Sequence, residues 1–155
     1  MRIIVFSDTH KNINNCTRLL QNMPGVDLVV HLGDYVGDAY DLQILHPSLK
    51  FEIVRGNNDF EPVKTEKLID MAGKKILITH GHVHGVKTNI QNLKDYAASV
   101  GADLALFGHT HLPYTDDTYP MMMNPGFSGS CMNATYGVVE IENGVLKTAV
   151  CRFYK

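Results

Sequence analysis

The chain has 155 residues, of which 45% are hydrophobic, enough for one well-buried core. Fourteen basic and sixteen acidic residues give a formal charge of −2 with no run of either sign, which argues against binding of long nucleic acid. No apolar stretch approaches the roughly 18 residues of a membrane span, and the opening MRIIVFSDTH turns polar too soon for a signal peptide. We therefore expect one domain over residues 1–155, soluble and cytoplasmic, with no membrane partner.

Three cysteines, Cys16, Cys131 and Cys151, are an odd number without CxxC spacing. This pattern argues against a disulfide framework and against a zinc-thiolate site. We expect all three to be reduced and half-buried.

Short apolar runs recur along the chain and predict strands covered on both faces. They span residues 3–6, 28–32, 51–54, 76–79 and 104–107. Helical spacing lies between them and is clearest from Ile90 to Val100, with Thr88 and Gln91 placed as a capping box and Gly101 at the end. Alternating strands and helices indicate an α/β fold.

The end of the chain predicts an antiparallel hairpin. Residues 137–142 and 145–153 flank Asn143-Gly144, the dipeptide best suited to a two-residue type I′ turn.

Each of the five predicted strands is followed by polar residues. These are Ser7-Asp8-Thr9-His10, Gly33-Asp34, Arg55-Gly56-Asn57-Asn58-Asp59, His80-Gly81-His82 and Gly108-His109-Thr110-His111. Ligands of α/β sheets gather outside the carboxyl ends of strands, so these segments are expected to converge on one site.

Carboxylate, imidazole and amide side chains together suit borderline divalent metal ions. Seven residues are candidate ligands: Asp8, His10, Asp34, Asn57, His80, His109 and His111. Seven are too many for one tetrahedral ion and suit two ions that share a carboxylate. Two ions about 3.5–4 Å apart can share a hydroxide and neutralise a phosphoryl group, so the pattern indicates phosphoester hydrolysis.

The five segments, in this order, resemble the motifs of the calcineurin-like metallophosphoesterases. The short length, the Thr-His-Gly-His segment and Asn124-Pro125-Gly126 are most similar to its small bacterial and archaeal YfcE-type phosphodiesterase branch. The resemblance implies a four-layer αββα sandwich of two mixed β-sheets flanked by helices, and it spans residues 1 to about 126.

The resemblance also implies a ligand set. Asp8, His10 and His111 are expected to hold one ion, and Asn57, His80 and His109 the other. Asp34 is expected to bridge both. Mn²⁺ is the first expectation for the two divalent ions, with Ni²⁺, Co²⁺, Fe²⁺, Zn²⁺ or Mg²⁺ as alternatives.

Asn58 departs from the family pattern, because many relatives carry a histidine there and the small branch often has cysteine. An amide can donate a hydrogen bond but cannot deliver a proton at neutral pH. We predict that Asn58 stabilises charge in catalysis, that esters with good leaving groups react best, and that diesters are preferred over monoesters.

Four further side chains lie near these motifs. Lys11 lies either over the mouth of the site or in solvent, and Arg55 contacts either phosphate or Asp59. His82 contacts either substrate or a ligand residue, and His84 is expected in an exposed loop. His31 interrupts an apolar strand and is either a core histidine or a partner of the site.

The substrate is expected to be a small phosphoester. Three adjacent methionines, Met121 to Met123, cannot all face one way on a strand, so some are expected to be exposed or at a homo-oligomer interface. Two alternatives remain open: a non-catalytic protein-binding scaffold like the retromer subunit Vps29, and a metal-dependent nuclease. The competent ligand set disfavours the first, and the near-neutral charge disfavours the second.

Overall fold

The structure, a computed structural model, describes residues 1–153 and contains two five-stranded mixed sheets. The first sheet has the order β10-β9-β1-β2-β3. Its strands are β1 (Arg2–Phe6), β2 (Leu28–His31), β3 (Phe51–Ile53), β9 (Thr135–Glu142) and β10 (Val145–Arg152). The strands β1, β2 and β3 are parallel, whereas β9 is antiparallel to both β1 and β10.

The second sheet has the order β4-β5-β6-β8-β7. Its strands are β4 (Glu66–Met71), β5 (Lys74–Thr79), β6 (Leu104–Leu106), β7 (Tyr114–Asp116) and β8 (Met121–Asn124). The strands β5, β6 and β8 are parallel, and β4 and β7 run antiparallel at the edges. Two of these ten strands, β4 and β7, carry too little apolar pattern to stand out in the sequence.

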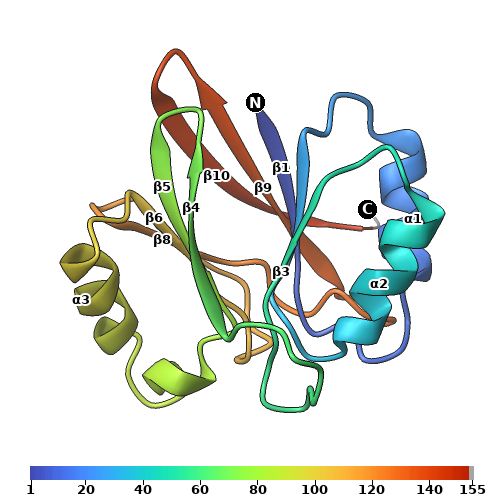
Figure 1. Ribbon diagram of the computed structural model, residues 1–155, viewed down its shortest axis with the longest axis horizontal. Coiled ribbons are helices and arrows are strands. Elements are labelled where there is room, and N and C mark those ends of the chain that lie inside the picture. The colour runs from blue at the N-terminus through green and yellow to red at the C-terminus, as the bar shows by residue number, and fades with distance from the viewer. Residues whose placement is uncertain (154–155) are drawn as a thin grey trace.

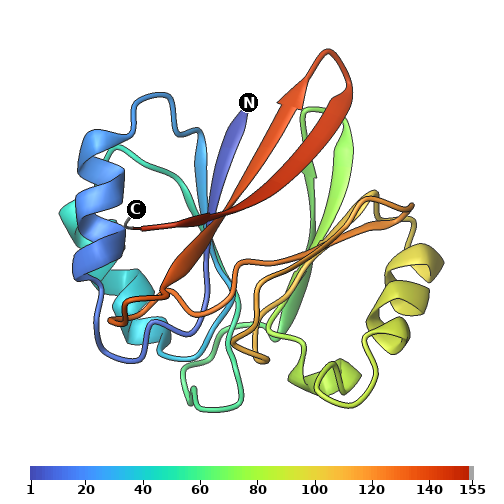
Figure 2. The ribbon, with the colours of Figure 1, turned by 180° about the vertical axis from the view of Figure 1, so that it is seen from behind.

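The two sheets pack face to face, with helices on both outer faces (Figure 1). The helices α1 (Asn14–Asn22) and α2 (Val36–Leu45) cover the first sheet, and α3 (Gln91–Ser99) covers the second. Seen from behind, β10 ends beside α1 (Figure 2). The expected four-layer αββα sandwich is confirmed.

Alternate residues of each strand serve two different hydrophobic cores, which explains the continuous apolar runs. Ile3 and Val5 face the core between the sheets, whereas Ile4 and Phe6 face the core under α1 and α2. Every one of these side chains is fully buried. The outermost layers are thus held by the same strands that carry the polar segments.

The methionine run belongs to this pattern and contradicts the expectation of exposed methionines. Met123 lies between the sheets, Met122 lies under α3, and both are fully buried, while Met121 is partly buried. A strand with a sheet on one side and a helix on the other buries both of its faces. Met122 and Met123 are therefore core residues.

The start of α3 differs from the predicted capping box. The helix begins after Ile90, and Thr88 makes no side-chain cap; instead Oδ1 of Asn89 accepts the N–H of Gln91 at 3.0 Å. The Gln91 side chain donates to Asp95, one turn later. Gly101, with φ of +71°, ends the helix as expected.

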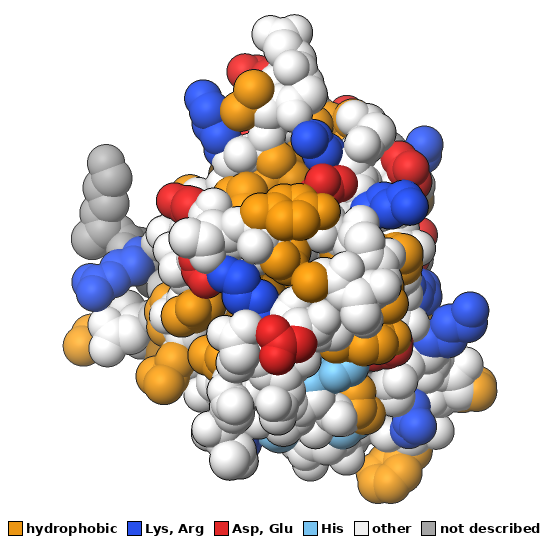
Figure 3. Space-filling view, turned by 90° about the vertical axis from the view of Figure 1, so that its left-hand side faces the viewer, with side chains coloured by type: hydrophobic (Ala, Val, Ile, Leu, Met, Phe, Trp, Pro, Cys, Tyr) orange, Lys and Arg blue, Asp and Glu red, His pale blue; other side chains and the backbone are white. Residues whose placement is uncertain are grey.

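The predicted hairpin is confirmed, since Asn143 and Gly144 both have positive φ between β9 and β10. The cysteines are all free, but only Cys151 is half-buried as expected, since Cys16 is buried and Cys131 is exposed. Within residues 1–153, no helix combines the length and apolar character that crossing a membrane requires. Figure 3 looks onto the face of the molecule that carries α3.

Candidate metal centre

The five polar segments meet at one end of the sandwich, where the carboxyl ends of the parallel strands of both sheets lie. The loops after β1, β2 and β3 come from the first sheet, and those after β5 and β6 come from the second (Figure 1). Backbone hydrogen bonds tie them pairwise: the N–H of Asp8 donates to Gly33 at 3.1 Å, and that of Gly108 donates to His80 at 3.0 Å. Both sheets therefore contribute residues to the site. Strand–helix alternation alone predicts a site at the edge of a single open sheet.

Four predicted ligands form one tight cluster at this junction. One ligand atom from each of Asp8, His10, Asp34 and His111 lies within 4.8 Å of the other three. The distance from Asp8 Oδ1 to His111 Nε2 is 3.0 Å, and that from Asp8 Oδ1 to His10 Nε2 is 3.9 Å. These distances are typical of atoms that share a metal ion, because bonds of about 2.0–2.2 Å separate neighbouring ligands by about 3–4 Å.

Two further predicted ligands, His80 and His109, adjoin this cluster. His80 is fully buried, and its Nε2 lies 3.5 Å from Asp34 Oδ1 and 3.2 Å from His109 Nδ1. Its other ring nitrogen, Nδ1, lies 2.8 Å from the carbonyl of Leu32 and must donate to it. The Nε2 lone pair therefore faces Asp34 and His109, as in histidines that bind metal through one nitrogen and a carbonyl through the other.

The residues present fit divalent metal ions. His10 Nε2 is buried and has no hydrogen-bond partner within residues 1–153, which is a costly state for a ring nitrogen without a ligand. The donor set contains carboxylate oxygens and imidazole nitrogens and no thiolate. Such a set suits Mn²⁺, Fe²⁺, Co²⁺, Ni²⁺ or Zn²⁺.

Five of the predicted ligands share a strained backbone conformation. Asp8, His10, Asp34, His109 and His111 have φ between +48° and +68°. Their neighbours Lys11 and Tyr35 also have positive φ, of +63° and +75°. Elsewhere in residues 1–153 the only other non-glycine residues with positive φ are Ala72 and Asn143, next to glycines of hairpin turns. Backbone strain of this kind concentrates at functional sites.

Asp59 holds two of these loops together through its carboxylate. It accepts the backbone N–H groups of Asp34, Tyr35 and Val36 at 2.8–2.9 Å and that of Gly56 at 2.7 Å. The side chain is 4% exposed. The predicted alternative of an ion pair with Arg55 is wrong, because Arg55 reaches only the Asp59 carbonyl, at 3.4 Å.

Glycines stand where two loops approach too closely for a side chain. A Cβ atom on Gly56 would collide with the Asp34 carboxylate, and one on Gly108 would collide with Ser7 Oγ. The Gly-Asn and Gly-His parts of the motifs thus have a packing reason that is independent of any metal.

Asn58 lies directly against Asp34. Its backbone N–H and its side-chain Nδ2 donate to the two carboxylate oxygens at 3.1 and 2.8 Å. Burial alone would raise the pKa of Asp34, but the nearby His80 and these two hydrogen bonds lower the pKa below its ordinary value. Asp34 is therefore held as a carboxylate.

His109 is held neutral at ordinary pH. Burial, the neighbouring His80 and the cation of Lys87 together lower the pKa of His109 to about 4. A neutral imidazole is the form that binds metal ions.

His31 is both a buried histidine and a partner of the site. Its Nδ1 accepts the N–H of Gly33 at 3.2 Å, which leaves Nε2–H to donate to Thr9 Oγ1 at 3.1 Å. Thr9 in turn donates to Asp38 Oδ2 at 2.6 Å. Burial lowers the pKa of His31 to about 4, so this chain of hydrogen bonds links the first two motifs through a neutral ring.

Aromatic rings enclose the His10 imidazole. The ring centres of Tyr35 and Phe127 lie 5.1 and 5.5 Å from that of His10, and Phe127 also lies 5.4 Å from His111. Lys11 Nζ lies 5.5 Å from the Tyr35 ring centre, so Lys11 contacts an aromatic ring at the edge of the site. Sequence reasoning missed Tyr35, Phe127, Asp38 and the role of Asp59, since only the fold reveals these contacts.

The other predicted residues lie around this centre. Asn57 is exposed in the loop next to Asn58, and the His82 ring lies 5.5 Å from His80 and 6.2 Å from His109, with a buried Nδ1. His84 is not in an exposed position: its side chain is 14% exposed, and its Nε2 lies 2.7 Å from Glu66 Oε2. Glu66 also accepts a hydrogen bond from the hydroxyl of Tyr96. Through His84, Glu66 anchors the turn that also carries His82.

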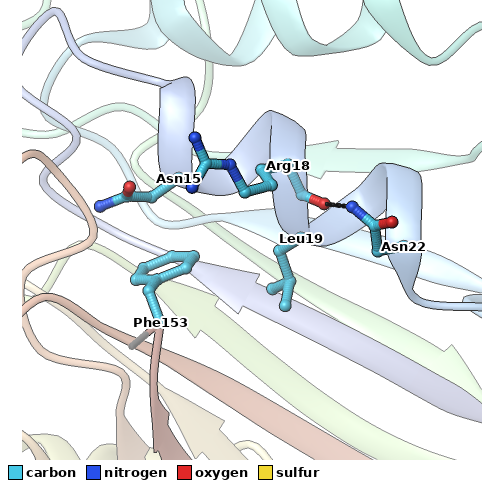
Figure 4. A pocket seen from close by; sticks show the side chains of 5 residues that line it. All are labelled: Asn15, Arg18, Leu19, Asn22 and Phe153. Atoms are coloured by element: carbon cyan, nitrogen blue, oxygen red, sulfur yellow. Dashed lines mark hydrogen bonds between the residues drawn. The ribbon is translucent and has the colours of Figure 1, made fainter. Parts of the chain in front are cut away.

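A second concavity lies against α1 and holds none of the predicted ligands (Figure 4). Its volume is about 210 Å³, and the ring of Phe153 faces the helix across it.

The geometry and the family comparison agree. The calcineurin-like phosphoesterase superfamily domain matches residues 1–144, so the chain belongs to this superfamily. It is 32% identical to the probable metallophosphoesterase YsnB of Bacillus subtilis, over 99% of this chain and 90% of YsnB. It is 29% identical to phosphodiesterase MJ0936 of Methanocaldococcus jannaschii, over 96% and 93% of the two chains, and belongs to the same small branch. The chain is a metal-dependent phosphoesterase.

Solved structures show the same architecture. The crystal structure of a predicted phosphoesterase from Streptococcus pneumoniae superposes with a TM-score of 0.81 at 26% identity, covering 98% of this chain and 89% of that one. Vps29 of Entamoeba histolytica, in complex with zinc, superposes with a TM-score of 0.77 at 19% identity, covering 99% of both chains. At this identity the likeness to Vps29 concerns the fold alone.

Proposed function

We propose that the protein hydrolyses small phosphodiesters with two divalent metal ions, Mn²⁺ being favoured. Asp8, His10 and His111 would hold one ion, and Asn57, His80 and His109 the other. Asp34 would bridge the two. The observation that carries the proposal is the position of Asp34, which belongs to the four-residue cluster and also lies 3.5 Å from His80.

The chemistry of this proposal is divided between the ions and the chain. Two divalent ions, when bound by these residues, would supply a nucleophile at neutral pH and neutralise negative charge on the phosphoryl group. The chain keeps Asp34 ionised through Asn58 and fixes the His80 ring through the Leu32 carbonyl. Tyr35 and Phe127 restrict the His10 ring, which limits the reorganisation needed when substrate binds.

The chemistry of Asn58 supports the part of the proposal that names diesters with good leaving groups as substrates. Its amide lies beside Asp34, within the centre, and can donate a hydrogen bond to a phosphoryl oxygen but cannot protonate a leaving group. An aryl leaving group departs without such a proton, whereas an alkoxide does not. The formal charge of −2 supports a small substrate over a nucleic-acid polymer.

The test is hydrolysis of bis(4-nitrophenyl) phosphate and 4-nitrophenyl phosphate by metal-stripped protein. Mn²⁺, Ni²⁺, Co²⁺, Zn²⁺ and Mg²⁺ are added back one at a time, and Asp117→Asn, which changes an exposed carboxylate, is the control for Asp34→Asn. We expect turnover of the diester that requires metal and is lost only in Asp34→Asn. Absence of turnover with every ion, while two ions bind, would overturn the proposal and favour a binding scaffold.

A further inference from the structure

A groove of about 520 Å³ opens beside the metal centre, between residues 86–90 and 110–114. Its lining combines four apolar side chains, two hydroxyl-bearing ones and one cation: Val86, Ile90, Leu112 and Pro113, then Thr110 and Tyr114, and Lys87. None of the described residues that line it carries a carboxylate. Pockets that bind small molecules have volumes of about 300–1,000 Å³ and a similar apolar lining with few polar groups.

Both walls of the groove are fixed to the loops of the metal centre. Thr110 stands between His109 and His111, and its Oγ1 accepts hydrogen bonds from Asn124 Nδ2 at 3.0 Å and from the Leu112 N–H at 3.2 Å. On the other wall, a methyl group of Val86 fills the space that a Cβ on Gly81 would need, one residue after His80. The two walls of the groove are therefore continuous with the loops that carry His80, His109 and His111.

Apolar surface in the groove is exposed without a protein partner. Leu112 is 68% exposed, although it lies one residue from His111. Tyr114 is held by packing against Phe107, with ring centres 6.1 Å apart, so its ring is a rigid part of the wall. In Figure 3, histidine and apolar side chains lie next to each other on the lower part of the face that carries α3.

Lys87 gives the groove a positive charge. It is exposed, and it is the one cation among the described residues that line the groove. The groove thus offers apolar contact along its walls and a positive charge for an anion near the centre.

We propose that this groove binds one ester group of the phosphodiester and selects a flat aromatic group, with Lys87 attracting the attached anion. This inference rests on the proposed function and adds the substrate class to it. Leu112 and Lys87 are then specificity-determining residues of the same site.

Phenylphosphonate and methylphosphonate test the groove, because they share an anionic head and differ in the aromatic ring. Their affinities for the Mn²⁺-loaded protein are measured by calorimetry in the wild type and in Leu112→Ser. Ile44→Ser, on α2, is the matched control, because Ile44 is 75% exposed on the opposite outer layer. We expect Leu112→Ser to weaken phenylphosphonate roughly three- to tenfold and to leave methylphosphonate unchanged, as loss of apolar contact requires.

The second variant is Lys87→Gln, with Lys50→Gln, at another exposed lysine, as its control. We expect Lys87→Gln alone to weaken both phosphonates about two- to fivefold, less at high salt. The inference is overturned if phenylphosphonate does not bind, or if Leu112→Ser affects both phosphonates equally or neither. Hydrolysis of bis(4-nitrophenyl) phosphate is followed in parallel: if it persists while the groove variants have no effect, the inference fails and the proposed function stands.

Discussion

The imidazole of His80 and the carboxylate of Asp34 come from different sheets and lie 3.5 Å apart. Asp34 follows β2 of the first sheet, and His80 follows β5 of the second. Their contact exists only because the two sheets pack with the carboxyl ends of these strands at the same end of the sandwich. A metal ion held by both residues would therefore link the two sheets as well as bind substrate.

The first prediction concerns metal binding by Asp34. Asp34→Asn should remove the shared carboxylate and lower the number of Mn²⁺ ions bound per chain from two, with an affinity loss of at least about tenfold. Equilibrium dialysis with metal analysis measures this without reference to activity. Asp117→Asn should bind as the wild type does; unchanged stoichiometry in Asp34→Asn would contradict the bridging role.

The second prediction concerns the stability supplied by Asp59. Asp59→Ala leaves four backbone N–H groups without their acceptor, so it should lower the free energy of unfolding by at least about 3 kcal/mol. Urea denaturation of the metal-free protein measures the change. Asp117→Ala, at an exposed site, should alter it by less than about 0.5 kcal/mol. A loss of that small size in Asp59→Ala would show that the four hydrogen bonds together contribute little to stability.

The roles of Asp59 and His84 show which part of the site lies beyond sequence reasoning. Asp8, Asp34, His80 and His109 follow apolar strands in short motifs, so their convergence is predictable from strand order and residue type. The acceptor role of Asp59 depends on the loop after β3 crossing the start of α2, and no spacing rule encodes that contact. His84 finds Glu66 on β4, a largely polar strand without a clear pattern.

The limits of the fold prediction have a similar cause. The buried strands β1, β2, β5 and β6 are visible as apolar runs, because each is covered on both faces. The short edge strand β7 and the half-exposed β4 lack that pattern, since edges need little apolar surface. The division into two sheets came from the family resemblance, because alternating strands and helices do not specify how many sheets the strands form.

The third prediction concerns pH and His31. The folded protein keeps His31 neutral, with a pKa of about 4, whereas the unfolded chain binds a proton near pH 6.5. Stability from this group is therefore complete above about pH 6.5 and is lost as the pH falls toward 4, by about 3 kcal/mol in total. In the metal-free protein, the lowered pKa of His109 also makes stability fall as the pH falls. The lowered pKa of Asp34 affects stability only at more acidic pH.

Urea denaturation of metal-free protein between pH 4 and pH 7 measures this dependence. His31→Gln keeps a polar group at the position but cannot titrate, so its slope should be smaller than that of the wild type by about 1.4 kcal/mol per pH unit. The wild type and His31→Gln should differ most in slope below pH 6. Parallel curves for the two proteins would show that folding does not lower the pKa of His31.

The fourth prediction concerns Asn58 and the leaving group. Asn58→His places an imidazole, which can deliver a proton, where the amide now donates to Asp34 Oδ2. Alkyl phosphodiesters, whose leaving groups need that proton, should gain about tenfold or more in kcat/KM relative to aryl phosphodiesters. Asn58→Ala is the matched control: it also loses the hydrogen bond to Asp34 but supplies no proton, so the alkyl-to-aryl ratio should not rise. If Asn58→His and Asn58→Ala give the same ratio, proton delivery at this position does not limit the reaction, and the preference for good leaving groups has another origin.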